Sequence, residues 1–165
     1  MIAARDPERR GAVLWQINAA NRPIGPLGEI VWGGANDATR AYFGLNGGAA
    51  IAVQLTTGTR AWLRPFESVD PQRSGNNSAI TVAGPVVLLG GWDGAVHALN
   101  ATSGAEVWSF NTQREFQTVN GVSARGGSIG GPGPVVVGGT VFVNSGYIGV
   151  QRGAPGNVLL AFTAE

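Results

Sequence analysis

The sequence contains no cysteine and no lysine, and it carries a single histidine and a single methionine. The absence of cysteine removes disulfides, thiolate zinc sites, iron–sulfur clusters and covalent haem attachment from this chain. The eleven basic residues are all arginine, they are scattered along the chain, and the formal net charge is only +1. Nothing resembles the basic patch that follows a phosphate backbone, so nucleic acid is not an expected partner.

Long hydrophobic runs are also missing. The apolar run at residues 85–89 is far shorter than the roughly 20 residues that a membrane helix needs. The first ten residues are charged and lack the apolar centre of a secretory signal. We therefore expect no membrane span, and either a cytoplasmic protein or one whose true start lies upstream. The register of the repeats described below favours the upstream start.

Glycine and proline, in contrast, are abundant, with 27 and nine residues in a chain of 165. Such a composition favours many short strands joined by tight turns. No amphipathic helical stretch of useful length appears. The sequence therefore predicts an all-β chain that is long enough to bury a real core.

One pattern recurs along the chain. Residues 98–108 read as the end of a strand, a polar turn closed by Gly104 and a second strand that carries Trp108. Residues 52–62 have the same layout, and residues 4–15 form a weaker copy with one extra residue in the turn. We expect Trp62 and Trp108 to occupy equivalent outer strands and to be largely buried between neighbouring sheets, with Trp15 matching them in conformation.

Alternating apolar residues and glycine turns divide the chain into repeated units of a single fold. A period near 46 residues with four strands per unit fits the blades of a β-propeller. We predict an orphan outer strand at 11–18, blades at 28–66 and 76–111, and an incomplete blade at 125–163. The predicted strands are 29–33, 39–45, 49–54 and 59–66; then 78–83, 85–90, 95–100 and 105–111; then 135–137, 140–144 and 157–163.

About three four-stranded antiparallel blades are too few for a closed ring, which needs at least about four. We therefore expect a partial β-propeller that forms an open arc, with its two ends apart. Unpaired strand edges at both ends favour self-association or poor solubility.

The repeated segments resemble the pyrroloquinoline-quinone (PQQ) repeat, Ala-x-Asp-x-x-Thr-Gly-x-x-x-Trp. In place of the usual Asp the chain has Asn100 and Gln54. The C-terminal third is similar to the end of the cytochrome-type polyvinyl-alcohol dehydrogenases of the quinoprotein alcohol dehydrogenase family. The matching segments are 28–32, 116–122, 126–128, 131–134, 143–147 and 155–162.

This resemblance implies a periplasmic or secreted protein with an eight-bladed catalytic propeller. It also implies PQQ with a bound calcium ion, which takes electrons from an alcohol, and a cytochrome whose haem passes them on. The chain departs from the family because it has no Cys-x-x-Cys-His and only about three blades. It therefore looks like the C-terminal part of a longer protein or a truncated gene product, with haem only in a cytochrome domain absent here.

Polar residues near the innermost strands are the natural site candidates, because these strands line the central funnel of a propeller. Trp32 offers a flat face to a planar quinone, and the alternative is packing between blades. Asn76, Asn77 and Ser78 are suited to hydrogen-bond quinone carboxylates or to ligate a hard cation, and the alternative is turn capping.

Arg125 and the following Gly126-Gly127-Ser128 segment are further cofactor-binding candidates, because together they can hold a carboxylate through charge-assisted hydrogen bonds. The alternative is that these glycines only allow a close approach of inner strands. Asp93 is rejected as a catalytic base because Asp-Gly is expected in a hairpin turn, and His97 stands alone on a strand. No catalytic residue and no metal ligand is assigned.

The leading hypothesis is a fragment of a PQQ-dependent alcohol dehydrogenase of the polyvinyl-alcohol type. In the full-length parent it would use an alcohol substrate and a cytochrome electron acceptor. The alternative is a non-catalytic PQQ-like propeller that serves as a protein-binding scaffold in the cell envelope. A third reading is that the fragment alone is inactive, because the cofactor site spans blades that it lacks.

Overall fold

The computed structural model describes residues 1–19, 29–67, 75–76, 78–147 and 153–163, and every named element in these ranges is a β-strand. The strands are β1 (Ile2–Asp6), β2 (Ala12–Ile17), β3 (Ala35–Asn36), β4 (Arg40–Leu45), β5 (Ala49–Gln54), β6 (Arg60–Pro65), β7 (Thr81–Ala83), β8 (Val86–Gly90), β9 (Ala95–Asn100), β10 (Glu106–Asn111), β11 (Glu115–Gln117), β12 (Ser123–Arg125), β13 (Val135–Val137), β14 (Thr140–Ser145) and β15 (Val158–Thr163).

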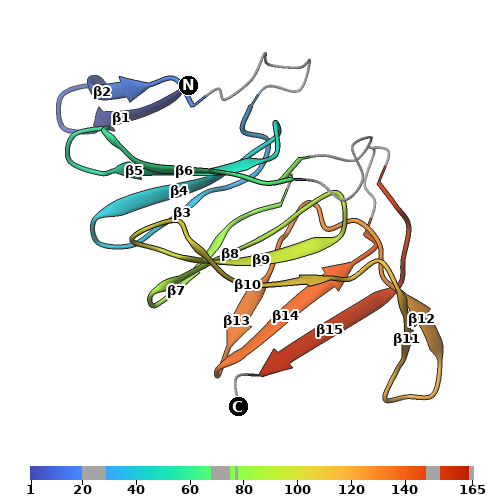
Figure 1. Ribbon diagram of the computed structural model, residues 1–165. Coiled ribbons are helices and arrows are strands. Elements are labelled where there is room, and N and C mark those ends of the chain that lie inside the picture. The colour runs from blue at the N-terminus through green and yellow to red at the C-terminus, as the bar shows by residue number, and fades with distance from the viewer. Residues whose placement is uncertain (20–28, 68–74, 77, 148–152, 164–165) are drawn as a thin grey trace.

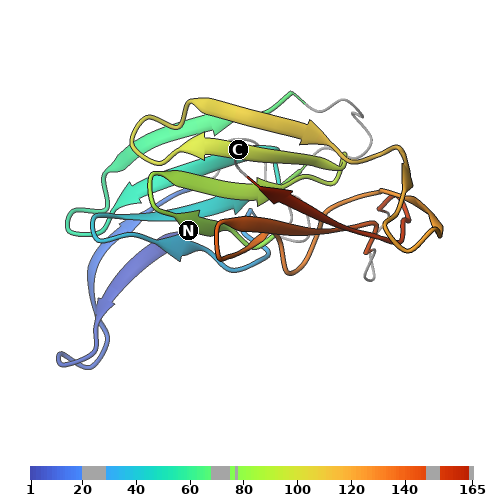
Figure 2. The ribbon, with the colours of Figure 1, turned by 90° about the horizontal axis from the view of Figure 1, so that it is seen from below.

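The strands form antiparallel sheets that follow one another along the chain. We call β3–β6 blade 1, β7–β10 blade 2 and β13–β15 blade 3; blades 1 and 2 have four strands and blade 3 has three. The hairpins β1–β2 and β11–β12 are separate two-stranded sheets. Figure 1 shows the sheets stacked in chain order, with the N-terminal hairpin and blade 3 at opposite ends of the stack. Figure 2 shows β1–β2 inclined to the strands of the other sheets. This is the open arc of stacked blades that the repeats predict.

The second and third strands of each blade lie within one residue of their predicted bounds, and the first strand of blade 3 has its predicted bounds, but the first strands of blades 1 and 2 do not. Residues 29–33, predicted as a strand, form none, and blade 1 begins instead at the short β3. The backbone before β3 forms a hydrogen bond to blade 2 instead: the Gly33 carbonyl accepts from the Ile80 amide at 3.2 Å.

Two further elements correct the expected organisation. Residues 11–18 are not an orphan strand, since β2 pairs with β1, and the two correspond to the third and fourth strands of a blade. The segment between blades 2 and 3, expected as a plain connector, contains the hairpin β11–β12.

The core between blades 1 and 2 is built from a repeated row of residues. In blade 1, Tyr42 stands opposite Ala52, and Ala52 stands opposite Trp62. These three residues pack against the buried Leu89 and Leu99 of blade 2. The same register places Leu88, Ala98 and Trp108 in one row of blade 2. The equivalence of Trp62 and Trp108 is therefore confirmed, and Trp15 opposite Ala4 is the third instance.

Each tryptophan sits beside a β-bulge and reaches the next sheet. The Trp15 indole donates to the Leu55 carbonyl at 2.7 Å, and the Trp62 indole donates to the equivalent Ala101 carbonyl at 3.0 Å. Each ring also covers the turn glycine of the next blade, Gly58 or Gly104, which has a φ of 72°. An added Cβ would lie only 2.6 Å and 2.7 Å from these rings. Glycine is thus required both for the turn and for the contact.

Trp62 is only 8% exposed, as expected, but Trp108 is 39% exposed, so the expectation that Trp108 is largely buried is wrong. Its ring instead rests edge-on against Phe162 of blade 3, with 5.2 Å between ring centroids.

The two ends of the stack do not pair with each other. β2 is hydrogen-bonded to β1, and β15 is hydrogen-bonded to β14, in separate sheets. None of the described segments forms a helix of the length and apolarity that crossing a membrane requires.

Candidate functional site

The strands of each blade run between two opposite ends of the sheet, and these ends carry different chain connections. At one end, which we call the connector end, the chain enters the first strand and the second strand turns into the third. At the other end, the turn end, the first strand turns into the second and the third into the fourth. Ser78 lies at the connector end of blade 2 beside Gly90, the last residue of β8. The candidate residues Asn76, Ser78 and Ser128 all lie at this end, while Asn77 falls outside the described residues.

The hydroxyls of the two candidate serines are engaged within the fold. Ser78 Oγ accepts a hydrogen bond from the Gly90 amide at 2.7 Å and donates to the Gly90 carbonyl at 3.1 Å. Ser128 Oγ donates to the Trp92 carbonyl and accepts from the Ala154 amide at 2.8 Å. Both residues are buried, so their hydroxyls fasten connectors to neighbouring strands.

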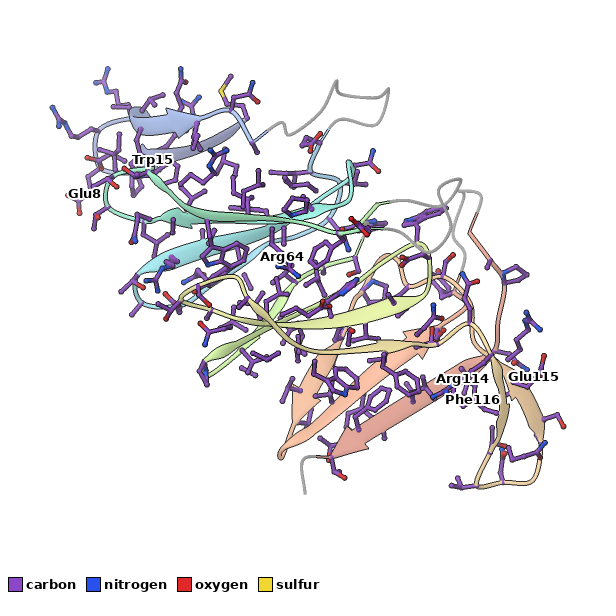
Figure 3. All side chains as sticks on the ribbon, in the orientation of Figure 1. Glu8, Trp15, Arg64, Arg114, Glu115 and Phe116 are labelled. Atoms are coloured by element: carbon purple, nitrogen blue, oxygen red, sulfur yellow. The ribbon has the colours of Figure 1, made fainter. Side chains whose placement is uncertain are left out.

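Arg125 lies on β12, where its Nη1 donates to Glu115 Oε1 on β11 at 2.8 Å. Both side chains are well exposed, so this ion pair contributes little to stability. Figure 3 shows Glu115 on the hairpin that stands at the edge of the stack, beside blade 3. Arg125 is therefore held on the hairpin, away from the candidates of blades 1 and 2.

Trp32 and Asn76 have groups without a partner among the described residues. Trp32 is 48% exposed rather than packed between blades, so a face of its ring is available. Asn76 is more than nine-tenths buried, and no described residue donates a hydrogen bond to its Oδ1. Its backbone amide donates to the Leu45 carbonyl at 3.2 Å, which fixes it against the connector end of blade 1.

Three residues at the same end were not identified from the sequence. Glu29 Oε1, Trp92 Nε1 and Gln113 Nε2 are buried atoms without a hydrogen-bond partner in the described part of the chain. The Glu29 carbonyl accepts from the Asn46 amide at 2.7 Å, and the Trp92 amide donates to the Gly75 carbonyl at 2.9 Å. These contacts anchor Glu29 and Trp92 at the connector ends of blades 1 and 2.

Arg40 Nε and Arg64 Nε are also buried without a partner among the described residues, and the four atoms named above are two acceptors and two donors. The carboxylate oxygen of Glu29 and the amide oxygen of Asn76 are ligand types that calcium prefers. The N–H groups of Trp92 and Gln113 suit carbonyl or carboxylate oxygens. Among the described residues, no group of three His, Cys, Asp or Glu side chains could hold a metal ion. The atoms therefore fit a quinone and calcium in kind, without completing a metal site in the described segments.

Asp93 and His97 have structural partners. Asp93 Oδ1 accepts a hydrogen bond from the Ala95 amide at 3.1 Å within its turn. His97 Nδ1 lies 2.7 Å from Glu106 Oε1, and its ring stacks on Phe66 of blade 1 with 4.2 Å between centroids. Glu106 also faces Arg64, labelled in Figure 3, at 3.7 Å. The contacts of His97 and Glu106 with Phe66 and Arg64 therefore join blade 2 to blade 1.

The strongest electrostatic perturbation lies at the turn end. Asp37 accepts hydrogen bonds from the Tyr42 hydroxyl at 2.5 Å, the Thr39 amide at 2.6 Å and the Arg40 amide at 2.7 Å. Burial by itself would raise the pKa of Asp37, but these hydrogen bonds together hold it well below its usual range. Burial and the bond to Asp37 raise the pKa of Tyr42 to about 12.

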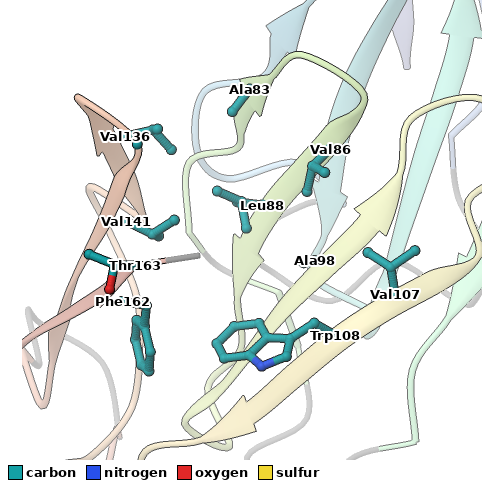
Figure 4. A pocket seen from close by; sticks show the side chains of 11 residues that line it. Ala83, Val86, Leu88, Ala98, Val107, Trp108, Val136, Val141, Phe162 and Thr163 are labelled. Carbon is teal, nitrogen blue, oxygen red and sulfur yellow. The ribbon is translucent and has the colours of Figure 1, made fainter. Parts of the chain in front are cut away.

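An apolar groove of about 540 Å³ opens at the turn end between blades 2 and 3. Figure 4 shows Trp108 facing Phe162 across it, with Leu88 and Val141 in its walls. The lining carries no charged side chain, so the groove offers no group for acid–base chemistry.

The sequence profile of the PQQ_2 family, described as outer membrane protein assembly factor BamB, matches residues 2–125 and 46–165. The chain belongs to this family of PQQ-repeat proteins. Solved structures of similar fold include BamB from Moraxella catarrhalis, at 20% identity and a TM-score of 0.63 over 84% of this chain and 39% of that one. Another is the quinohemoprotein alcohol dehydrogenase ADHIIG from Pseudomonas putida HK5, at 19% identity and a TM-score of 0.62 over 82% of this chain and 24% of that one. These likenesses confirm the partial β-propeller.

Two curated relatives align over essentially the whole chain. The polyvinylalcohol dehydrogenase of a Pseudomonas species is 33% identical over 187 aligned residues, which cover 99% of this chain. The enzyme of the same name from Sphingopyxis sp. strain 113P3 is 31% identical over 100% of this chain. The match spans only 29% of the length of each of these relatives.

Proposed function

We propose that the chain is the C-terminal propeller segment of a PQQ-dependent, periplasmic or secreted alcohol dehydrogenase that passes electrons to a cytochrome. One observation carries this proposal, namely the similarity to two polyvinylalcohol dehydrogenases along essentially the whole chain. Because the match covers 29% of each relative, the activity belongs to a longer protein of which this segment supplies adjacent blades.

The connector end supports a cofactor-facing role for these blades. A fold that satisfies its polar groups internally leaves few buried unpaired atoms. Among the described residues, Arg40, Arg64, Asn76, Glu29, Trp92 and Gln113 each have one, and the last four lie near the connectors of blades 1 to 3. Such atoms are suited to partners that come from outside the segment.

Bound PQQ would supply the two-electron acceptor for alcohol oxidation, and calcium would polarise it. The Trp32 ring would stack on the planar quinone, and the Asn76 and Glu29 oxygens would face the cation. The N–H groups of Trp92 and Gln113 would donate to quinone oxygens. The buried connectors would exclude water from this contact.

The alternative function is a non-catalytic propeller scaffold that binds proteins in the cell envelope. The observation that favours it is the match to the family described as an outer membrane protein assembly factor, together with the BamB-like fold. A scaffold has no need for the unpaired polar atoms at the connector end, so cofactor binding separates the two functions.

The test is calorimetric titration of the purified chain with PQQ, in the presence and absence of calcium. We expect calcium-dependent binding that becomes about tenfold weaker in Trp32→Ala and in Asn76→Ala, the loss of about 1.4 kcal/mol each. Val119→Ala, on the fully exposed tip of the β11–β12 hairpin, is the matched control and leaves binding unchanged. Absence of PQQ binding by the folded chain would reject the cofactor role and favour the scaffold.

A further inference from the structure

Two fully buried hydroxyl groups lie between blades 2 and 3 at the connector end. Thr112 follows β10 and Ser145 ends β14, and neither residue is exposed to solvent. The two hydroxyl oxygens are 2.7 Å apart. Thr112 Oγ1 is also 2.8 Å from the carbonyl oxygen of Gly94 in the β8–β9 turn, and Ser145 Oγ accepts from the Gly127 amide at 2.8 Å. The hydroxyl pair therefore connects the β8–β9 turn of blade 2 with the chain that leads into blade 3.

The direction of these hydrogen bonds follows from counting protons, since each hydroxyl has only one to donate. Because the two oxygens are in hydrogen-bond contact, one hydroxyl must donate to the other. The shortest contacts are all satisfied when Ser145 donates to Thr112 and Thr112 donates to the Gly94 carbonyl. The Gly127 amide then starts an unbroken chain of three hydrogen bonds that ends at Gly94. Loss of either hydroxyl breaks this chain and leaves buried polar groups without partners.

The hydroxyl chain holds the two residues whose buried N–H groups have no partner among the described residues. Trp92 belongs to the same turn as Gly94, and its carbonyl accepts a hydrogen bond from Ser128 Oγ. Gln113 follows Thr112 directly, and its side chain lies against this turn, since a Cβ added at Gly94 would come within 2.6 Å of Gln113 Cγ. A shift of Gly94 or Thr112 would therefore move Trp92 Nε1 and Gln113 Nε2 with it.

The backbones that the hydroxyls join are already in close contact. A Cβ added at Gly126 would collide with the Thr112 carbonyl, and one added at Gly127 would collide with the Ala154 carbonyl. A Cβ at Gly94 would lie only 2.7 Å from the Gly127 carbonyl oxygen. Because these segments touch without intervening side chains, the hydroxyl pair can fix how they lie relative to each other.

We propose that Thr112 and Ser145 are positioning residues of the connector end. Their hydroxyls hold the β8–β9 turn against residues 126–128, and this fixes where the N–H groups of Trp92 and Gln113 point. The ligand that those N–H groups would meet, the oxygens of a bound quinone, rests on the proposed function. The positioning of the two side chains does not depend on it.

The first experiment needs no ligand and follows the indole N–H signals of the five tryptophans by NMR, with that of Trp92 assigned through Trp92→Phe. We expect Thr112→Val and Ser145→Ala to shift the Trp92 indole signal and the Gly127 amide signal, and Thr112→Ser, which keeps the hydroxyl, to restore both. Thr81→Val is the matched control, because Thr81 Oγ1 donates to the Pro134 carbonyl at 2.5 Å and so also joins blade 2 to the chain that enters blade 3. It should leave the Trp92 signal in place.

The other indole signals report whether each variant is folded, and Ser145→Ala breaks the same chain at its other hydroxyl if Thr112→Val does not fold. An unchanged Trp92 signal in the folded variants overturns the proposal. An equal shift of that signal in Thr81→Val also overturns it, because any loss of a hydrogen bond between these blades would then have the same effect.

The second experiment is calorimetric titration of the same variants with PQQ and calcium. We expect Thr112→Val to bind about tenfold more weakly, as is typical when a residue that orients a ligand-binding group is lost, and Thr112→Ser and Thr81→Val to bind like the wild type. A wild type that binds no PQQ rejects the proposed function, and the indole signals alone then decide the positioning. Equal binding by the wild type and Thr112→Val would show that the hydroxyl chain does not position the ligand's partners.

Discussion

At the scale of single residues, the tryptophans show how much a repeated pattern can and cannot reveal. The spacing from glycine to tryptophan predicts that Trp62 and Trp108 are equivalent, and the shared register opposite Ala52 and Ala98 confirms it. Burial could not be predicted in the same way, because it depends on the turn of the following blade. Trp62 is covered by that turn, closed by Gly104, whereas Trp108 rests against the Phe162 ring of blade 3.

This difference predicts unequal costs of truncation. Trp62→Ala removes an enclosed ring and its hydrogen bond to Ala101, and it should lower the free energy of unfolding by about 3–5 kcal/mol. Trp108→Ala removes a ring that is 39% exposed, and it should cost only about 1–2 kcal/mol. Urea unfolding of both variants beside the wild type measures the two losses. Equal losses would mean that Trp108 is enclosed in solution.

The candidate site likewise contains residues that the sequence selects as candidates and residues that only the structure reveals. Residue types and their place before inner strands select Trp32 and Asn76 as candidates; Trp32 is half-exposed, and Asn76 Oδ1 has no partner among the described residues. Glu29, Trp92 and Gln113 escaped prediction because nothing in their local sequence marks a buried atom without a partner. That property arises only when blades are packed together.

At the scale of elements, strands with strong alternation and glycine turns could be predicted closely. β5 and β9 have their predicted bounds, because both are apolar and follow a tight turn. β1 was missed because Arg5 and Asp6 make it look like a charged leader, and β11 was missed because it is polar and short. The first strands of blades 1 and 2 were predicted too long, because the backbone before them bonds to the neighbouring blade, as Gly33 does to Ile80.

The connection between β3 and β4 makes a pH-dependent contribution to stability. Hydrogen bonds hold the pKa of Asp37 below its unfolded value, so the ionised carboxylate is favoured in the folded state. This stabilisation is fully present above about pH 5 and is lost as the pH falls through about 4 toward the folded pKa. The turn therefore weakens in acid.

Asp37→Asn should lower the free energy of unfolding by about 1–2 kcal/mol at pH 7, after discounting for the partial exposure of the carboxylate. Denaturant midpoints measured from pH 7 to pH 2 should then show the two proteins converging in acid, because protonation removes the same charge from the wild type. Asn36→Ala, on the adjacent exposed residue, is the control and should parallel the wild type. A constant difference between wild type and Asp37→Asn at every pH would mean that the carboxylate charge is irrelevant.

At the scale of the whole molecule, we expect the open stack of blades to bind the cofactor without catalysing alcohol oxidation. The connector ends of blades 1 to 3 contribute one arc of side chains, whereas a site on a propeller axis is completed by blades all round the ring. The segment that matches the polyvinylalcohol dehydrogenases is 29% of their length, so most of such a ring is contributed by other residues. Under the proposed function, this partial site would hold the cofactor weakly through Trp32 and Asn76, and it would lack the groups that orient an alcohol against the cofactor.

We therefore expect the purified chain to oxidise no alcohol, polymeric or small, even with PQQ and calcium supplied in excess. The physical reason is that catalysis needs substrate and acceptor held together within tenths of an ångström, and one side of the site is not supplied by these blades. A dye-linked assay against a heat-killed control measures this. Activity above that control would mean that the three blades contain every group the reaction needs, and the arc would then be a whole active site rather than part of one.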